Sequence, residues 1–416
     1  MHLKFKKAYF ATTVLLILTK STFSQLSTFK DSLLGQINTI TTSVPFLQIA
    51  PDSRAGGMGD YGVATSPDAN SIHWNASKLA FIDKDAGFSI SYTPWLHALV
   101  NDISLAYVSG YKKLKNDQVI AGSLLYFSLG NIDFTNEGGD KYASFNPHEW
   151  ALDLAYSRKL GEKFSGGIVL RYIYSDLTGG VAISNGTINT HAGTSVAADL
   201  SGYYRTDLDL SNKKAQLALG LNISNIGAKI SYTDTKQKDF IPTNFRLGSN
   251  LKVDLDQYNS ISFGVDFNKL LVPTPPVYAK DASGNFIIDA NGNKEIAAGK
   301  DPINVTVPSA IFSSWSDAPA GFSEEIKEFT YSIGSEYWYD KQFAMRAGYF
   351  HEASTKGNRK FFTVGAGLKY NVFGFDFAYL IPTTQRNPLE NTLRFTLLFD
   401  FDGVSSSNRD NNDSTE

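Results

Sequence analysis

The chain contains no cysteine, which excludes disulfide bonds, thiolate metal sites and a cysteine nucleophile. Charged residues make up only 19% of its 416 residues, and 38 basic against 41 acidic residues leave a net charge of -3. This balance offers no basic surface to a polyanion, so we expect no nucleic-acid partner. The absence of cysteine also fits a chain exported from a bacterial cell.

Long hydrophobic runs are missing from residue 25 onward. A membrane-spanning helix needs about 20 apolar residues, and no later stretch provides them, so a membrane form of the mature chain would have to be a β-barrel. The one apolar run lies at the start, where Lys4, Lys6 and Lys7 precede residues 8–18. This pattern predicts a signal peptide at residues 1–24.

Catalytic motifs are also missing: the sequence has no nucleophile elbow, no HExxH and no phosphate-binding glycine loop. His148 and His351 are each followed by glutamate but lack a second histidine one turn later, and we interpret them as rim residues. Residues 289–293 (DANGN) lack the spacing and distal glutamate of a calcium loop, and we interpret them as a turn. We therefore expect no enzyme activity, no cofactor and no metal.

Glycine and aromatic residues are abundant instead, with 34 Gly, 21 Tyr and 29 Phe. From residue 86 onward, apolar residues alternate with small or polar ones, which is the period of a β-strand. The alternation is clearest in residues 150–157, 215–224, 245–251, 261–267, 362–371 and 393–401. We count about fourteen strands, an even number as in bacterial outer-membrane barrels.

The two faces of these strands favour a membrane barrel over a soluble β-sandwich. One face is rich in Leu and Phe, whereas the other mixes Gly and Ala with isolated charges instead of the Lys, Glu and Thr of a solvated face. This indicates a crowded polar lumen and an outer surface in contact with outer-membrane lipid. The isolated lumen charges could form a catalytic site, but buried charges more often pair. We expect pairing between Arg246, Arg346 or Arg394 and Asp266, Glu336 or Asp376.

The connections between strands alternate in length. Short ones are expected at residues 112–117, 159–163, 207–214, 254–259, 340–342 and 371–374. The intervening ones, at residues 94–102, 130–148, 176–194, 227–243, 272–327, 351–359 and 382–391, are mostly longer. Outer-membrane barrels have short periplasmic turns and longer extracellular loops, so this pattern predicts that both termini are periplasmic and the long loops extracellular.

The predicted fold is thus all-β: a transmembrane antiparallel barrel of about 14 strands at residues 85–402, preceded by an N-terminal plug at residues 25–84. The tail at residues 403–416 is polar and of low complexity, and we expect it to be disordered. The insertion at residues 272–327 predicts a small extracellular hairpin and an exposed apolar surface for a partner. The candidate partner-binding residues are Phe286, Ile287, Ile288, Ile311, Phe312, Trp315 and Phe322.

Residues 51–80 (PDSRAGGMGDYGVATSPDANSIHWNASKLA) differ from every later segment. Their glycines and turn-forming residues predict a compact irregular plug, anchored by the ring of Trp74. The plug either only stabilises and seals the barrel, with Arg54 paired to lumen carboxylates, or moves as a gate. The candidate plug residues are Arg54, Gly56, Gly57, Met58, Gly59, Asp60, Asp68, Trp74 and Asn75.

This segment resembles the N-terminal signature of the PorV outer-membrane proteins of type IX secretion systems and, more distantly, of FadL-like barrels. The R-A-x-x-M-G…V-A…D-A…W-N-P-A…L pattern is matched, except that Ala76 replaces its proline, by Arg54, Ala55, Gly57, Met58, Gly59, Val63, Ala64, Asp68, Ala69, Trp74, Asn75 and Leu79. The resemblance implies an integral outer-membrane protein that binds cargo with a C-terminal signal domain at a SprA/Sov-type translocon barrel. It would then deliver that cargo to a PorU-type signal peptidase.

Two alternatives remain open at this stage. The FadL-like resemblance implies transport of hydrophobic small molecules, which would need an apolar path through the lumen. A soluble secreted β-protein with adhesive or enzymatic function would have to explain the Phe- and Leu-rich face and the alternation of loop lengths in some other way.

Overall fold

The computed structural model describes residues 37–96, 100–135, 138–180, 189–234, 238–281, 283–290, 292–302, 304–384 and 387–402. The predicted signal peptide, residues 25–36 of the predicted plug segment and the predicted disordered tail lie outside these ranges. None of the helices in the described ranges is both long and apolar enough to span a membrane. The described residues form two compact units, here called the barrel unit (within residues 42–270, 330–351 and 359–402) and the connection unit (within residues 37–41, 271–329 and 352–358).

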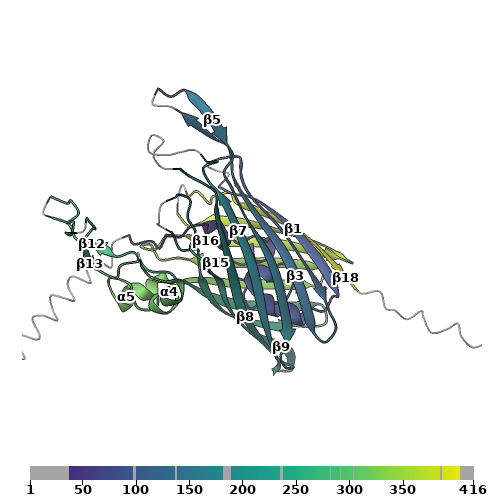
Figure 1. Cartoon of the computed structure of the whole chain (residues 1–416). Helices are drawn as coiled ribbons and strands as arrows, with labels where there is room; N and C mark the ends of the chain where they lie inside the picture. Colours follow the sequence, from purple (N-terminus) through teal and green to yellow (C-terminus); the bar gives the residue numbers. More distant parts are fainter. Residues whose placement is uncertain are drawn as a thin grey trace, which may run out of the picture. The chain divides into compact units, whose positions relative to one another are not determined.

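Fourteen antiparallel strands close into a barrel in the barrel unit (Figure 1). Each strand pairs with its neighbours in chain order, and β18 closes the ring against β1. The barrel strands are β1 (Ala86–Pro94), β2 (Ile103–Lys113), β3 (Gln118–Leu129), β6 (His148–Lys159), β7 (Phe164–Asp176), β8 (Gly193–Leu210), β9 (Lys213–Gly227), β10 (Asn244–Asp254), β11 (Asn259–Leu270), β14 (Thr330–Tyr339), β15 (Phe343–His351), β16 (Lys360–Tyr370), β17 (Phe373–Pro382) and β18 (Leu393–Phe401). The predicted fold class and strand number are confirmed.

Burial along the strands follows the predicted alternation. In β7, Ile168, Leu170 and Tyr172 are exposed on the outer surface, whereas Val169 and Arg171 are buried inside. Because successive side chains of a strand point to opposite faces, the same period gives the barrel an apolar exterior and a mixed interior. An apolar exterior is what a lipid bilayer requires of a spanning barrel.

The connections alternate in length as predicted, but two of the short ones are shorter than expected. The turn expected at residues 371–374 is only residues 371–372, since β17 begins at Phe373. The expected turn at residues 207–214 is only Ser211 and Asn212, both at positive φ, because β8 and β9 extend further than their hydrophobic pattern indicates. A two-residue hairpin turn needs such backbone angles, and asparagine tolerates them well. The longer connection after β3 contains a hairpin that the sequence did not reveal, formed by β4 (Ile132–Thr135) and β5 (Lys141–Phe145).

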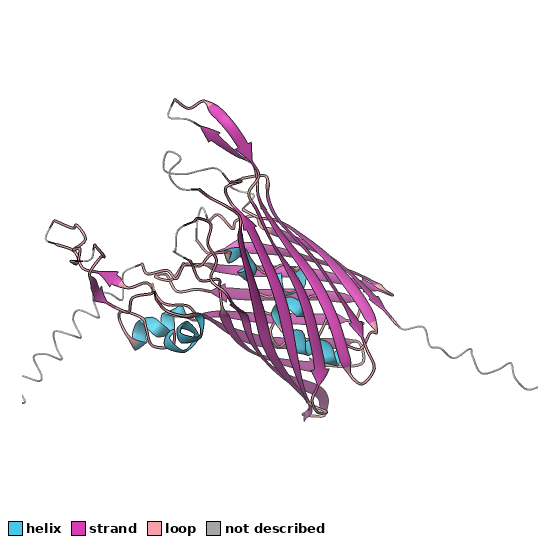
Figure 2. Ribbon diagram, in the orientation of Figure 1, coloured by secondary structure: helices cyan, strands magenta, loops and turns pink. Residues whose placement is uncertain are grey.

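The N-terminal segment lies inside the barrel, where Figure 2 shows its helices in cyan within the strands. These helices are short: η1 (Pro45–Gln48), α2 (Ser53–Gly56), α3 (Ser71–Trp74) and η2 (Ala76–Phe81). Helix α2 packs on β16, β17 and β18, and η2 packs on β6, β7 and β8. Since one-turn helices are not stable alone, these contacts with the wall hold them. We call the part of this segment at residues 44–82 the plug.

The connection unit has its own small elements. Strands β12 (Val277–Tyr278) and β13 (Ile296–Ala298) pair, and isolated bridges join Lys280 to Phe286 and Ile288 to Lys294. This arrangement agrees with the predicted hairpin. Three helical turns follow that the sequence did not predict: α4 (Val307–Ser313), α5 (Phe322–Glu325) and η3 (Ile326–Glu328).

Candidate functional site

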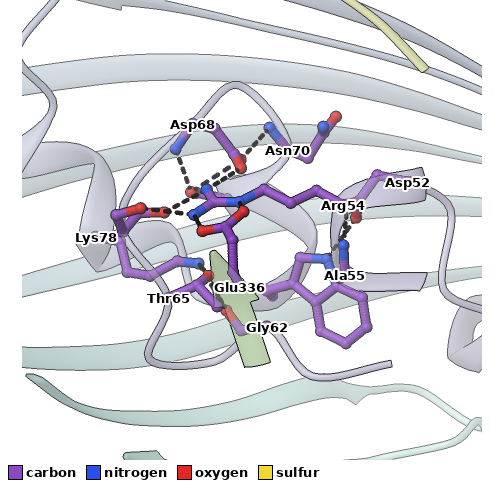
Figure 3. Close-up of polar contacts among 12 residues, drawn as sticks. Asp52, Arg54, Ala55, Gly62, Thr65, Asp68, Asn70, Lys78 and Glu336 are labelled. Atoms are coloured by element: carbon purple, nitrogen blue, oxygen red, sulfur yellow. Dashed lines mark hydrogen bonds and ion pairs between the residues drawn. The ribbon is translucent and has the colours of Figure 1, made fainter. Parts of the chain in front are cut away.

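The plug is held to the barrel wall by a buried guanidinium. Arg54, in α2, donates Nε to Glu336 Oε1 at 2.9 Å and Nη2 to Glu336 Oε2 at 2.8 Å, so it binds the carboxylate of β14 with both arms. Its Nη1 donates to Asp68 Oδ2 at 2.8 Å, and both Nη atoms reach Ser66 (Figure 3). Arg54 therefore fastens two stretches of the plug to one strand through charge-assisted bonds.

The remaining lumen charges pair partly as predicted. Arg346 bridges Glu336, at 2.9 Å, and Asp376, at 2.7 Å, as expected. Arg394 does not pair with a barrel carboxylate; its Nη1 donates to Asp60 Oδ1 of the plug at 2.6 Å. The predicted pairing of Arg246 and Asp266 with lumen charges is also wrong. In each case the plug is the reason, because it occupies the space between the facing walls of the barrel.

Arg246 and Asp266 contact the plug instead of each other. The guanidinium of Arg246 lies 5.1 Å from the ring of Trp74, which is a cation–π distance. Asp266 Oδ2 accepts hydrogen bonds from the backbone N–H groups of Gly62 and Val63, at 2.8 and 2.9 Å. A barrel carboxylate thus takes up two plug donors that would otherwise be buried without a partner.

Trp74 is buried within the plug. Its ring is buried, and its Nε1 donates to Asp52 Oδ1 at 2.7 Å, while Asp52 Oδ2 accepts from Ala55 N at 2.9 Å and caps α2. The side chain of Asn75 caps η2 by accepting from Ser77 N, and it donates to Val63 O at 3.1 Å. The departure at Ala76 from the family's proline leaves a regular 3₁₀ turn in place.

The glycines of the plug allow its backbone to lie flush against the wall. Gly59 adopts φ +73°, and a Cβ there would lie 2.6 Å from Tyr349 N. A Cβ on Gly56 would lie 2.3 Å from Arg394 Nη1, and one on Gly57 would lie 3.2 Å from the Gly365 Cα. Met58, between them, is fully buried. These positions cannot carry a larger residue unless the plug or the wall moves.

The wall contributes matching glycines that sequence reasoning did not single out. Gly264, Gly334 and Gly348 are paired across β11, β14 and β15. A Cβ at Gly264 would lie 2.0 Å from Tyr61 Oη, and one at Gly348 would lie 2.0 Å from the Met58 carbonyl carbon. We call these three the glycine row. Its only sequence signal is glycine in the inward phase of three successive barrel strands.

Two buried cations were also missed. Arg171 binds Asp153 at 2.7 Å and Asp199 at 3.2 Å across β6, β7 and β8. Lys78, at the end of the plug, donates to Gly62 O at 2.6 Å and to Thr65 Oγ1 at 2.9 Å (Figure 3). The signal for Arg171 was its inward position, since it lies directly opposite Asp153 in the register of β6 and β7.

Ion pairs join the plug to the barrel wall in one continuous network. Arg54, Glu336, Arg346 and Asp376 form one continuous chain of ion pairs. A carboxylate bound by two guanidinium groups is a poor base, and a guanidinium does not give up its proton. This cluster is therefore suited to holding the plug on the barrel wall.

The candidate partner-binding residues of the connection unit are mostly exposed. Phe312 and Phe322 are each 79% exposed, and Trp315 is 41% exposed with its ring 6.2 Å from that of Phe329. Phe286, Ile287 and Ile288 are exposed on the hairpin. Ile311 is the exception: it is half-buried, because its position in α4 turns it away from solvent. We call Phe312, Trp315, Phe322 and Ile326 the apolar surface of the connection unit.

Buried carboxylates lie in the same unit. Glu324 and Glu328 both accept from Lys356 Nζ, at 2.6 and 3.0 Å, and Glu328 also accepts from Thr274 Oγ1 at 2.7 Å. The ammonium of Lys356 and other hydrogen bonds lower the pKa of Glu324 against the effect of burial. Burial, together with repulsion from Glu328, raises the pKa of Asp317 to about 6.

Comparison with known proteins identifies the family. The family model described as type IX secretion system protein PorV matches residues 33–277. Comparison with curated proteins gives no match. Among solved structures, the Pseudomonas putida toluene transporter TodX is similar over 87% of this chain and 98% of its own, at 11% identity and a TM-score of 0.46.

A Pseudomonas aeruginosa FadL homologue is similar over 88% of this chain and 99% of its own, at 12% identity and a TM-score of 0.42. The family match covers more than half of the sequence and includes the whole plug and the first half of the barrel. The chain therefore belongs to the PorV family of type IX secretion system proteins, and its closed barrel with an apolar exterior is that of an outer-membrane protein.

Proposed function

We propose that this protein binds cargo proteins that carry a C-terminal signal domain, receives them at a SprA/Sov-type translocon barrel and delivers them to a PorU-type signal peptidase. The protein itself catalyses nothing in this scheme. The observation that carries the proposal is the combination of a lumen filled by a fastened plug with an exposed apolar surface in the connection unit. Binding of proteins therefore takes place outside the lumen.

The plug supports a role without passage through the barrel. Arg54 is tied to Glu336 and Asp68, and the plug backbone lies against the glycine row with no room for another atom. A ligand path through this region would require these ion pairs to break. Under the proposal the plug seals the barrel and preserves its shape.

The connection unit supports a protein-binding role. Phe312 and Phe322 present two nearly fully exposed aromatic rings, and Ile326 and Trp315 add further apolar area. Large aromatic side chains exposed to water are costly unless another surface covers them, and such residues are enriched in protein interfaces. The exposed hairpin at Phe286 adds a second apolar contact under the same proposal.

Deletion of residues 285–299 tests the role of the hairpin. The deletion leaves every barrel strand intact, so the barrel should still migrate faster on a gel before boiling in detergent. We expect the amount of cargo on the cell surface to fall. Unchanged cargo secretion by an assembled deletion variant would remove the hairpin from the proposal.

Cross-linking in native membranes tests the partners. Recovery of a large translocon barrel or a signal peptidase with this protein supports the shuttle. Recovery of neither, together with loss of fatty-acid uptake in a deletion strain, favours the alternative of a FadL-like transporter for hydrophobic small molecules. For that alternative the plug would have to move with each molecule transported.

A further inference from the structure

Three carboxylates of the connection unit converge in its buried interior. Asp317 follows α4, Glu325 ends α5 and Glu328 ends η3. All three side chains are buried, and one ligand oxygen of each lies within 4.8 Å of those of the other two. Glu325 and Glu328 are three residues apart in consecutive helical turns, which places them on one face.

One oxygen in this group has no hydrogen-bond partner. Asp317 is only 4% exposed, and its Oδ2 accepts from Thr274 N at 3.3 Å, whereas Oδ1 is buried with no donor in reach. An unsatisfied buried carboxylate oxygen is costly, since neither water nor protein compensates its lost hydration. A positive ion beside Oδ1 would remove that cost.

The charge in this region is unevenly distributed. Lys356 Nζ reaches Glu324 and Glu328, so its ammonium lies on the Glu328 side of the group. Asp317 is held by the N–H of Thr274, and Glu325 Oε2 accepts from Ala318 N at 3.2 Å. Both of these donors are backbone N–H groups, which are neutral and bring no positive charge to the two carboxylates.

We propose that Asp317, Glu325 and Glu328 bind a divalent cation, and that the cation is calcium. The donor set contains only oxygen, which suits a hard cation. Calcium lies about 2.3–2.6 Å from its ligands, so two ligands of one ion can be separated by up to about 5 Å. The three oxygens, all within 4.8 Å of one another, are close enough to share one such ion. Magnesium needs a near-ideal octahedral arrangement and gives up its water reluctantly, so an all-protein set of three buried carboxylates suits calcium better.

The site would clamp the connection unit internally. Asp317 and Glu328 both contact Thr274, at the entry of the long connection, while Glu325 and Glu328 lie near its exit. A cation among them would fix α5 and η3, which carry Phe322 and Ile326. Neither the site nor its test depends on which protein, if any, binds the apolar surface.

Calcium binding to the full-length protein in detergent, measured by isothermal titration calorimetry after treatment with chelator, tests the site. We expect one calcium per chain with a Kd on the order of 0.1 mM, as for extracellular modules, and at least tenfold weaker binding of magnesium. D317N and E325Q should each weaken calcium binding at least tenfold. D289N, which alters an exposed turn carboxylate of the same unit, is the matched control and should bind like wild type.

Limited proteolysis separates a cation site from a role in packing. Calcium should slow cleavage of the connection in wild type but not in D317N. In chelator, D317N should be cleaved no faster than wild type, because the substitution removes repulsion. Faster cleavage of D317N in chelator, unchanged calcium binding by D317N, loss of binding only in D289N, or no saturable binding up to about 5 mM calcium would each overturn the proposal.

Discussion

Replacing Gly348 by alanine should unseat the plug. Gly348 faces the lumen in β15, and its added Cβ would lie 2.0 Å from the Met58 carbonyl carbon and 2.2 Å from Gly59 N. Both are backbone atoms, so no side chain can rotate out of the way. Ordinary van der Waals contact begins near 3.4 Å, so the plug must retreat by about 1.4 Å, the difference between 3.4 and 2.0 Å.

The cost of that retreat can be built from two contributions. Overpacking a tight interior by one methyl group costs about 1–3 kcal/mol. The shift also breaks the hydrogen bond from Gly59 N to Thr363 Oγ1, now 2.8 Å, which contributes about 1 kcal/mol. A total of about 2–4 kcal/mol raises the population of the unseated plug by between about 30-fold and several hundredfold.

The lack of cysteine allows a clean measurement. A single cysteine in place of Ser71, a fully buried plug residue, should react with a maleimide only when the plug leaves its seat. The labelling rate then reports the open population, provided that reseating is faster than labelling. We expect the rate to rise in G348A by the factor estimated above.

G122A is the matched control. A Cβ at Gly122, in β3, would lie 3.5 Å from its nearest neighbour, the carbonyl oxygen of Asp153, which is an ordinary contact. G122A should therefore label as slowly as the parent. If G348A labels no faster than G122A while both barrels are heat-modifiable, the plug does not lie against the glycine row and the reasoning is refuted.

Three further changes test the buried contacts and the exposed surface. Arg54→Met should leave Asp68 without its guanidinium and Glu336 with Arg346 alone, at a cost of about 3 kcal/mol, with a rise in the same labelling rate that Arg54→Lys partly reverses. Trp74→Phe keeps a ring but loses one hydrogen bond to a carboxylate, so it should cost about 1–3 kcal/mol and accelerate labelling less than Arg54→Met does. Phe312→Ser combined with Phe322→Ser should leave the melting temperature of the barrel within about 2 °C of the wild-type value, because both rings are exposed. The double variant should nevertheless reduce the amount of cargo on the cell surface. Normal secretion would contradict the proposed role of the apolar surface.

The barrel could be predicted because its information is local. In each strand, apolar residues alternate with small or polar ones. The alternation of short and long connections shows which strand ends lie at the same end of the barrel. The facing ends of β8 and β9 were not predicted, because Leu208 and Leu210 continue β8 beyond the lipid-facing pattern and the hairpin closes at Ser211 and Asn212. Pairing between backbones can extend a strand past the point where its side chains have any reason to alternate.

Pairing of Arg54 with a lumen carboxylate was anticipated, but most other partners of the plug could not be predicted because they depend on its path through the lumen. Arg346 was assigned correctly, since its partner Glu336 lies directly opposite it on the neighbouring strand. The partner of Arg394 is Asp60, which is distant in sequence and reaches it only because the plug crosses the lumen there. The alternation of residues along the sequence shows which residues of neighbouring strands face each other. It does not show where the plug lies inside the closed barrel.

The family signature and the proposed activity fall on different parts of the molecule for a physical reason. Arg54, Trp74 and the plug glycines are all engaged in buried contacts, so any substitution there changes the barrel interior. A plug that opened for each transported molecule would have to break the Arg54 ion pairs before anything passed. The rings of Phe312 and Phe322 are already exposed and require no such opening. Under the proposed function, a partner protein binds the connection unit without any movement of the plug.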